Sequence, residues 1–126
     1  MPRAARKVSK TGIYHIMIRG INQGAIFIDE RDKGKFLDIM KMIKEEGAYD
    51  LYAYCLMNNH AHFLIKEAGM PVSLLMKKLC GSYAGWFNYR HGRMGHLFQD
   101  RFKSERVETD SYFRVVLKYI LNNPVL

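Results

Sequence analysis

The sequence predicts an α+β fold in which four strands and two helices are followed by a third, C-terminal helix. Two observations support this prediction. Residues 12–20 and 51–66 are rich in β-branched and aromatic residues and are bounded by glycine or interrupted by asparagine, which is typical of strands. Residues 32–47, 71–90 and 111–122 instead place apolar residues every three or four positions, which is the period of an amphipathic helix.

The first predicted strand covers residues 12–20. Because side chains alternate between the faces of a strand, Tyr14, Ile16 and Ile18 are expected on one face and His15 on the other. His15 could join a polar site on the sheet, although a lone histidine is more often a surface residue. A polar loop follows, and from Asp32 the apolar residues adopt helical spacing until a stop at residue 47.

Residues 51–57 and 60–66 are predicted to be two strands joined by the short polar turn Asn58-Asn59. Strands separated by so few residues form an antiparallel hairpin. His60 and His62 lie two positions apart at the start of its second strand, so their imidazoles are expected side by side next to the turn.

The second half begins with a longer helix that Pro71 opens, followed by a loop at residues 91–96. Residues 97–108 are predicted as one bent strand, or as a short strand with a turn before it. Thr109 or Asp110 can cap the final helix, which Pro124 ends. The order of elements is the βαββαβ of a ferredoxin-like fold with an antiparallel sheet and an added C-terminal helix. We expect residues 1–126 to form a single domain.

The sequence is strongly basic. It contains 20 Lys and Arg residues against 12 Asp and Glu residues, a formal net charge of +8. This excess favours a polyanionic partner, although charge alone does not separate nucleic acid from an anionic membrane surface. Cations interleaved with aromatic rings in the second half suit the phosphates and unstacked bases of single-stranded or hairpin nucleic acid. The alternative is that the rings are mostly core and the charges only solvate the surface. The candidate nucleic-acid contacts are Arg3, Arg6, Lys7, Lys77, Lys78, Arg90, Arg93, Arg101 and Lys103.

The composition also restricts the location of the protein. No apolar stretch is long enough to cross a bilayer, and the N-terminal residues lack the apolar segment of a signal peptide. We therefore expect a cytoplasmic protein with no membrane partner. Cys55 and Cys80 have no metal-binding spacing and are expected to be reduced core residues.

Two groups of residues have the chemistry of a catalytic site. Neutral imidazoles are good ligands for divalent metals, and His60 and His62 could form half of a metal site, although such a pair is more often simply half-exposed. Tyr119 and Asn123 lie four residues apart and share a face of the last helix, with Tyr112 two turns earlier. A tyrosine hydroxyl can attack phosphorus, and an amide oxygen can be a third metal ligand. Alternatively, Tyr119 is the edge of an apolar face and Asn123 a helix cap.

Together these residues resemble a known family. The segment Asn59-His60-Ala61-His62 resembles the HUH motif of single-tyrosine transposases, and residues 119–124 resemble the YIxxNP signature of their REP-associated branch. Residues 95–102 are similar to the glycine, aromatic-glutamine and arginine-aromatic stretch between those motifs. Asn58 stands where the family usually has proline, and relatives continue for some residues beyond the position of Leu126.

The resemblance implies a DNA transposase that cuts and rejoins single-stranded, hairpin-bearing DNA. His60, His62 and Asn123 would bind Mg²⁺ or Mn²⁺, and Tyr119 would form a covalent 5′-phosphotyrosine. A homodimer is slightly favoured over a monomer. The groups that could help to deprotonate the tyrosine are His15, His91 and His96. Two alternatives stay open: a non-catalytic, domesticated nucleic-acid-binding module of the same fold, and a small metal-binding or regulatory domain whose substrate is not nucleic acid.

Overall fold

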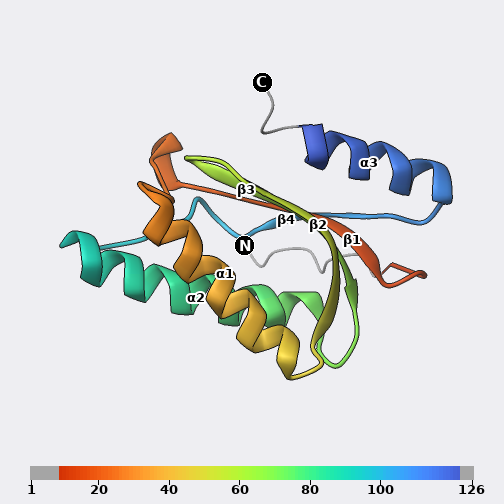
Figure 1. The fold of residues 1–126 in the computed structure, drawn as a ribbon, viewed down its shortest axis with the longest axis horizontal. Helices are drawn as coiled ribbons and strands as arrows, with labels where there is room; N and C mark the ends of the chain where they lie inside the picture. The colour runs from red at the N-terminus through yellow and green to blue at the C-terminus, as the bar shows by residue number, and fades with distance from the viewer. Residues whose placement is uncertain (1–8, 123–126) are drawn as a thin grey trace, which may run out of the picture.

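The computed structural model describes residues 9–122, which form a four-stranded antiparallel sheet with helices on both faces (Figure 1). The strand order is β2-β3-β1-β4. This arrangement confirms the predicted ferredoxin-like α+β fold with an added C-terminal helix. In chain order the elements are β1 (Ile13–Arg19), the 3₁₀ turn η1 (Ile21–Gln23), α1 (Glu30–Glu45), β2 (Tyr49–Leu56), β3 (His60–Glu67), α2 (Val72–His91), β4 (Lys103–Arg106) and α3 (Asp110–Asn122).

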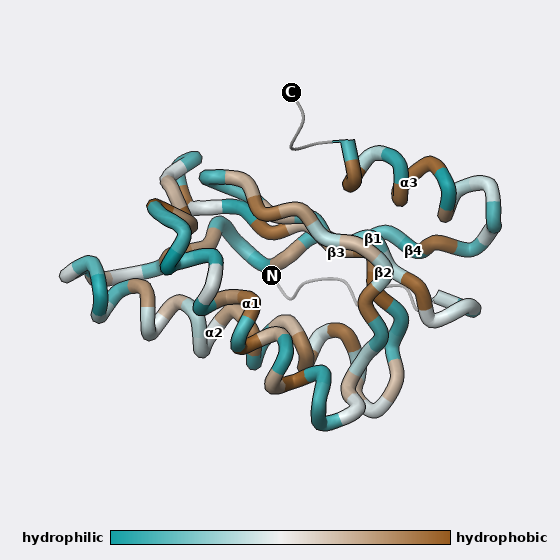
Figure 2. Tube along the Cα trace, in the orientation of Figure 1, coloured by the Kyte–Doolittle hydropathy of each residue, from teal (hydrophilic) through white to brown (hydrophobic). Residues whose placement is uncertain are grey.

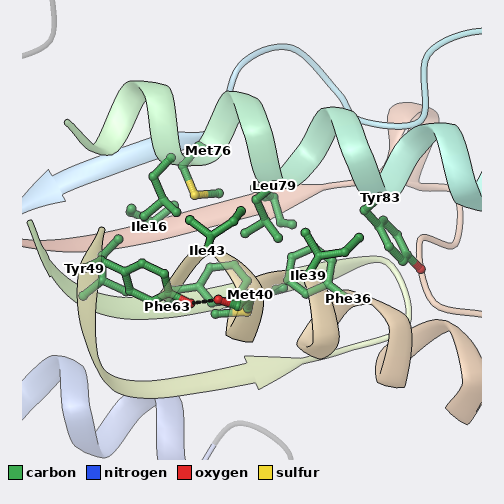
Figure 3. Close-up of a cluster of buried hydrophobic side chains, with 14 of the residues drawn as sticks. Ile16, Phe36, Ile39, Met40, Ile43, Tyr49, Phe63, Met76, Leu79 and Tyr83 are labelled. Carbon is green, nitrogen blue, oxygen red and sulfur yellow. Dashed lines mark hydrogen bonds between the residues drawn. The ribbon is translucent and has the colours of Figure 1, made fainter. Parts of the chain in front are cut away.

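The larger hydrophobic core lies between the sheet and helices α1 and α2. Tyr14, Ile16 and Ile18 of β1 all face this core, as the alternation of the sequence predicts. Phe36 of α1 stacks on Phe63 of β3, with ring centroids 5.7 Å apart (Figure 3). Phe36 also meets Tyr83 of α2 edge to face, with ring centroids 5.1 Å apart, so packed aromatic rings join both helices to one face of the sheet.

A smaller core lies on the opposite face, where α3 packs. Val116 and Ile120 of α3 are buried against Leu64 of β3. Figure 2 shows that the apolar residues of α3 gather on the side of the helix that faces the sheet. A β-bulge between Leu51 and Ala53 lets β2 contribute to both cores, because an extra residue reverses the faces of the strand after it.

The hairpin of β2 and β3 is antiparallel, with Leu56 opposite Ala61, which confirms the prediction for the turn at residues 58–59. Backbone N–H groups from outside the hairpin hold that turn, and Phe27 N–H is one of them, donating to the Asn58 carbonyl at 3.1 Å. The Gly20 N–H donates to the Asn59 carbonyl at 2.9 Å, and the Ile26 N–H donates to the Asn58 carbonyl at 2.8 Å. The start of β3 is therefore fixed from the side as well as by its own strand pairing.

Several element boundaries differ from those that the sequence predicts. Helix α1 begins at Glu30 rather than Asp32, because the Asp29 carboxylate accepts a hydrogen bond from the Asp32 N–H and caps the helix two residues earlier. Of the two alternatives for residues 97–108, the short strand is the one observed, as β4 covers only four residues. Asp100 before it has a positive φ of 56°, which interrupts an extended strand.

Strand β2 also begins two residues before its predicted start, at Tyr49. The caps of the last two helices agree with the sequence. The Thr109 hydroxyl accepts a hydrogen bond from the Tyr112 N–H at 3.1 Å and so caps α3. Gly92 ends α2 in the left-handed conformation. Cys55 and Cys80 are free thiols, the first buried and the second partly exposed. Among residues 9–122, none of the helices has the length and apolar character of a membrane span.

Candidate active site

Three elements bring two histidines and a tyrosine together on the face of the sheet that carries α3. The ring centroids of His62 on β3 and Tyr119 on α3 are 5.3 Å apart, and those of His62 and His15 on β1 are 5.2 Å apart. The ring centroids of His15 and Tyr119 are 6.2 Å apart. The structure therefore brings the terminal-helix tyrosine to the histidines of the hairpin.

His60 and His62 lie on the same face of β3, with ring centroids 5.2 Å apart and ring planes at 86°. The residues between and after them, Ala61 and Phe63, point the other way into the larger core. His62 is only 4% exposed, whereas His60 is half-buried. Burial of the intervening residues thus fixes the direction of both imidazoles.

Hydrogen bonds engage one nitrogen of each of these imidazoles. The Asn59 side-chain oxygen accepts from Nδ1 of His60 at 2.9 Å, so the lone pair of that ring lies on Nε2. Nδ1 of His62 lies 3.1 Å from Nε2 of His15. When His62 donates in this bond, its own Nε2 is also free to bind a ligand. The two histidines can then present a pair of Nε2 atoms.

Burial keeps these imidazoles neutral. Burial, followed by the neighbouring charges of His15 and His60, lowers the pKa of His62 to about 4. Burial also lowers the pKa of His60. For His15, burial lowers the pKa and the Glu105 carboxylate opposes that effect only in part. Neutral imidazoles keep the lone pair that a metal ion needs.

The donor set fits a divalent metal only in part. Within residues 9–122 there is no group of three or more His, Cys, Asp or Glu residues that could hold a metal ion. His60 and His62 can offer two nitrogen atoms to an ion, and any further ligands would have to come from elsewhere. Asn123, the predicted third ligand, lies outside the described residues.

Tyr119 lies at the edge of the packed face of α3. Val116 and Ile120 beside it are buried and hold the helix on the sheet, whereas Tyr119 is 53% exposed. Its ring therefore contacts His62 and remains open to solvent. Tyr112 differs, because its hydroxyl donates a hydrogen bond to the Glu105 carboxylate, and this bond, with burial, raises the pKa of Tyr112.

Only one of the three candidate helper histidines has a ring contact with Tyr119 in the structure. His15 contacts the ring of Tyr119, as described above. His91 at the end of α2 lies 2.9 Å from the Asp32 carboxylate, on the α1 side of the molecule. His96 lines a pocket beside α2. The sequence placed His15 on the correct face of β1 but did not reveal its contact with His62.

The predicted nucleic-acid contacts fall into three groups. Arg3, Arg6 and Lys7 lie outside the described residues. Lys78, Arg90 and Arg93 have partners within the protein: Lys78 pairs with Glu46, Arg90 with Asp29 and Asp32, and Arg93 with the Asn88 side chain and the His96 carbonyl. Lys77, Arg101 and Lys103 are exposed, and the first two line the pocket that also includes His96.

Comparisons with known proteins identify the family of the chain and its fold. A family model described as "Transposase IS200 like" matches residues 8–123. A REP-associated tyrosine transposase bound to a REP hairpin has a similar structure, with a TM-score of 0.78 and 17% identity over 99% of this chain and 73% of that one. A candidate transposase from Deinococcus radiodurans R1 has a TM-score of 0.63 and 19% identity over 96% of this chain and 97% of that one. At these identities the two structures establish a shared fold. No curated protein sequence matches the chain.

Proposed function

Because the chain belongs to the IS200-like transposase family, whose members cleave DNA, we propose that it cuts and rejoins single-stranded DNA with Tyr119 as the nucleophile. The observation that carries this proposal is the position of Tyr119, with its ring 5.3 Å from that of His62 and half of its surface exposed. A phenol in this position is accessible to a DNA strand and adjacent to two candidate metal ligands.

The proposed reaction exchanges one phosphodiester for another. The Tyr119 oxygen attacks the phosphorus, a bond forms between them, and the bond from phosphorus to the 3′ oxygen breaks. The phenol gives up its proton, and the departing 3′ oxygen takes one to become a hydroxyl. The tyrosine then carries the 5′ phosphate. Attack by a 3′ hydroxyl reverses the steps and joins the strands, so no external energy source is needed.

His60 and His62 would hold Mg²⁺ or Mn²⁺ through their Nε2 atoms, with Asn123 as the proposed third ligand. A bound ion of this kind would polarise a non-bridging phosphate oxygen and stabilise the charge that develops during attack. Because an ordinary tyrosine pKa is near 10, the phenol also needs help to lose its proton. His15 contacts the rings of His62 and Tyr119 and is the best-placed of the described residues to orient them.

The proposed substrate is single-stranded DNA that carries a hairpin. A formal net charge of +8 supports a polyanionic substrate. The similar transposase named above is bound to a REP hairpin, which supports a hairpin in particular. The sequence of the hairpin for this protein is a separate question, so a test must use a panel of hairpins.

The decisive experiment is detection of a covalent protein-DNA adduct. The protein would be incubated with labelled, hairpin-bearing single strands and Mn²⁺, and then denatured. We expect an adduct with the unmodified protein and none with Tyr119→Phe, whereas Tyr89→Phe, a matched change at a tyrosine that is 91% exposed on α2, should retain it.

The outcomes separate the rival functions. Salt-sensitive hairpin binding without an adduct across a broad panel would favour the non-catalytic binding module. An adduct that survives in Tyr119→Phe would refute the choice of nucleophile. If His60 is a metal ligand, adduct formation by His60→Ala should no longer respond to Mn²⁺.

A further inference from the structure

A pocket of about 500 Å³ lies between α2 and residues 95–102, on the side of the sheet that carries α2. Its volume is in the range of sites that hold small organic molecules. Met76, Cys80 and Ala84 of α2 line one wall, and the loop forms the other. The pocket shares no residue with the group formed by His15, His62 and Tyr119.

The pocket and the candidate active site are at the same end of the sheet. Arg19 at the end of β1 lines the pocket and is the strand partner of His60. The Gln99 N–H donates to the Arg19 carbonyl at 2.9 Å, which fixes the loop beside the end of β1. A DNA strand that leaves Tyr119 could therefore reach the pocket by passing around this end of the sheet.

The lining has the chemistry of a nucleotide site. Phe98 and Phe102 provide aromatic rings, on which a base of any type can stack. Three cations, Arg19, Lys77 and Arg101, lie at the pocket and are exposed, so they can meet phosphates.

Polar groups complete the lining. Asp100 is the one carboxylate among the lining residues. Gln99 supplies an amide whose oxygen accepts a hydrogen bond from the Asn22 N–H at 3.1 Å, so its NH₂ group is what it can offer to a ligand. A carboxylate repels phosphate but accepts hydrogen bonds from the amino groups of bases. The combination of rings, cations, a carboxylate and an amide donor fits a base with its phosphate better than it fits a free anion or an apolar peptide.

We propose that this pocket binds one unpaired nucleotide from the single-stranded DNA that adjoins the hairpin. The inference rests on the proposed function, because it takes the substrate to be hairpin-bearing DNA. It adds a second contact on the other face of the sheet, through which the protein recognises the flank of the hairpin as well as the scissile phosphate.

Gly81 offers a direct test, because it lines the pocket and a Cβ atom at this position would meet nothing within 4 Å. Gly81→Leu would occupy part of the pocket without a backbone clash and would strengthen the helix. Gly85, about one turn further along α2, is equally open but does not line the pocket, so Gly85→Leu is the matched control.

The first measurement compares the affinities of these proteins for two fluorescein-labelled probes. One is the hairpin of a broad panel that binds best, with a single-stranded extension of about six nucleotides on each side, and the other is the same hairpin with blunt ends. We expect Gly81→Leu to weaken binding of the extended probe about tenfold and to leave the blunt probe unaffected. Gly85→Leu should bind both probes as the unmodified protein does. Equal binding by all three proteins would overturn the proposal. It would also be overturned if Gly81→Leu changed only the self-association of the protein and not its affinity for the extended probe.

The second measurement uses the unmodified protein and does not depend on how a variant folds. Single abasic sites would be placed at each extension position in turn. We expect one position, or two adjacent ones, to weaken binding about tenfold, and the same abasic probe to cause no further loss with Gly81→Leu. A uniform response along the extension would overturn the proposal. Because both measurements use binding, they can fail while Tyr119 adducts still form, or succeed when no adduct forms.

Discussion

Nε2 of His15 lies 3.1 Å from Nδ1 of His62, although the two residues are on different strands. In the register of β1 and β3, Met17 is the direct partner of His62, so His15 is its diagonal neighbour on the same face. This contact holds the His62 ring by the nitrogen that is not needed for metal binding. His15 is thus in a position to orient His62, one of the two proposed metal ligands.

Replacing His15 should weaken metal binding. Outer partners of ligating histidines typically change metal affinity by about 10- to 100-fold when they are removed, so we expect a loss of this size for His15→Leu. His15→Gln should retain most of the affinity, because its amide can still accept a hydrogen bond from His62. Free Mn²⁺ measured by electron paramagnetic resonance in a titration provides the readout. His96→Leu is the control, since His96 lies at the α2 pocket, and equal affinity in His15→Leu would argue against a positioning role.

Tyr112→Phe should leave covalent adduct formation intact. The Tyr112 hydroxyl is occupied by the Glu105 carboxylate, which raises the pKa of Tyr112 and makes it a poorer nucleophile. We expect a loss of about 1 kcal/mol in the free energy of unfolding, the usual value of one hydrogen bond, with an unchanged yield of adduct. Denaturation in urea and gel analysis of adducts measure the two effects. Loss of the adduct here, with retention in Tyr119→Phe, would reassign the nucleophile.

Asp32→Asn should destabilise the protein in a pH-dependent manner. Burial tends to raise the pKa of Asp32, but hydrogen bonds from the Ile28 N–H, His91 and Arg90 outweigh it and lower the pKa below its ordinary value. A carboxyl group with a lowered pKa in the folded state stabilises the protein above the unfolded pKa of about 4, and the stabilisation is lost as the pH falls through the folded value. We expect a loss of about 2 kcal/mol at neutral pH.

Urea denaturation at several pH values checks this prediction. The difference between Asp32→Asn and the unmodified protein should shrink as the pH falls below about 4. Asp38→Asn is the matched control, since Asp38 is exposed on the same helix. A difference that is constant with pH would show that the charge of Asp32 is not the cause.

Gly20→Ala should be strongly destabilising. A Cβ atom at Gly20 would lie 1.9 Å from the Gly24 carbonyl oxygen, so the loop or the end of β1 must move. Because the Gly20 N–H also holds the turn before His60, we expect a loss of about 3 kcal/mol and a weaker metal affinity. Thermal unfolding measures the first effect. Gly34→Ala in α1, where a Cβ meets nothing within 4 Å, should instead stabilise by about 0.5–1 kcal/mol; similar effects of the two changes would contradict this account.

The sequence predicted those features that depend on local periodicity. The faces of β1 follow from alternation alone, so the burial of Tyr14, Ile16 and Ile18 was predicted correctly. The same rule placed His60 and His62 on one face beside a hairpin turn. The start of α1 was predicted two residues late, because the capping bond of Asp29 is a specific contact and leaves no trace in the apolar pattern.

Features that depend on pairing between distant segments could not be predicted. His15 meets His62 only because the register of two strands, 47 positions apart in sequence at that contact, makes them diagonal neighbours. The α2 pocket likewise needs the loop at residues 95–102 to fold against a helix. The partners of Arg90 on α1 were not evident either, which is why that cation was grouped with the predicted DNA contacts.

One face of β3 packs into the larger core and the other carries His60 and His62. This difference should affect which substitutions the protein tolerates during evolution. Ala61, Phe63 and Ile65 are almost completely buried, while His60 and His62 alternate with them. A lineage that loses transposition could discard the histidines, yet it must keep the residues between them to remain folded. Surviving inactive descendants should therefore be recognisable by an intact apolar half of this strand.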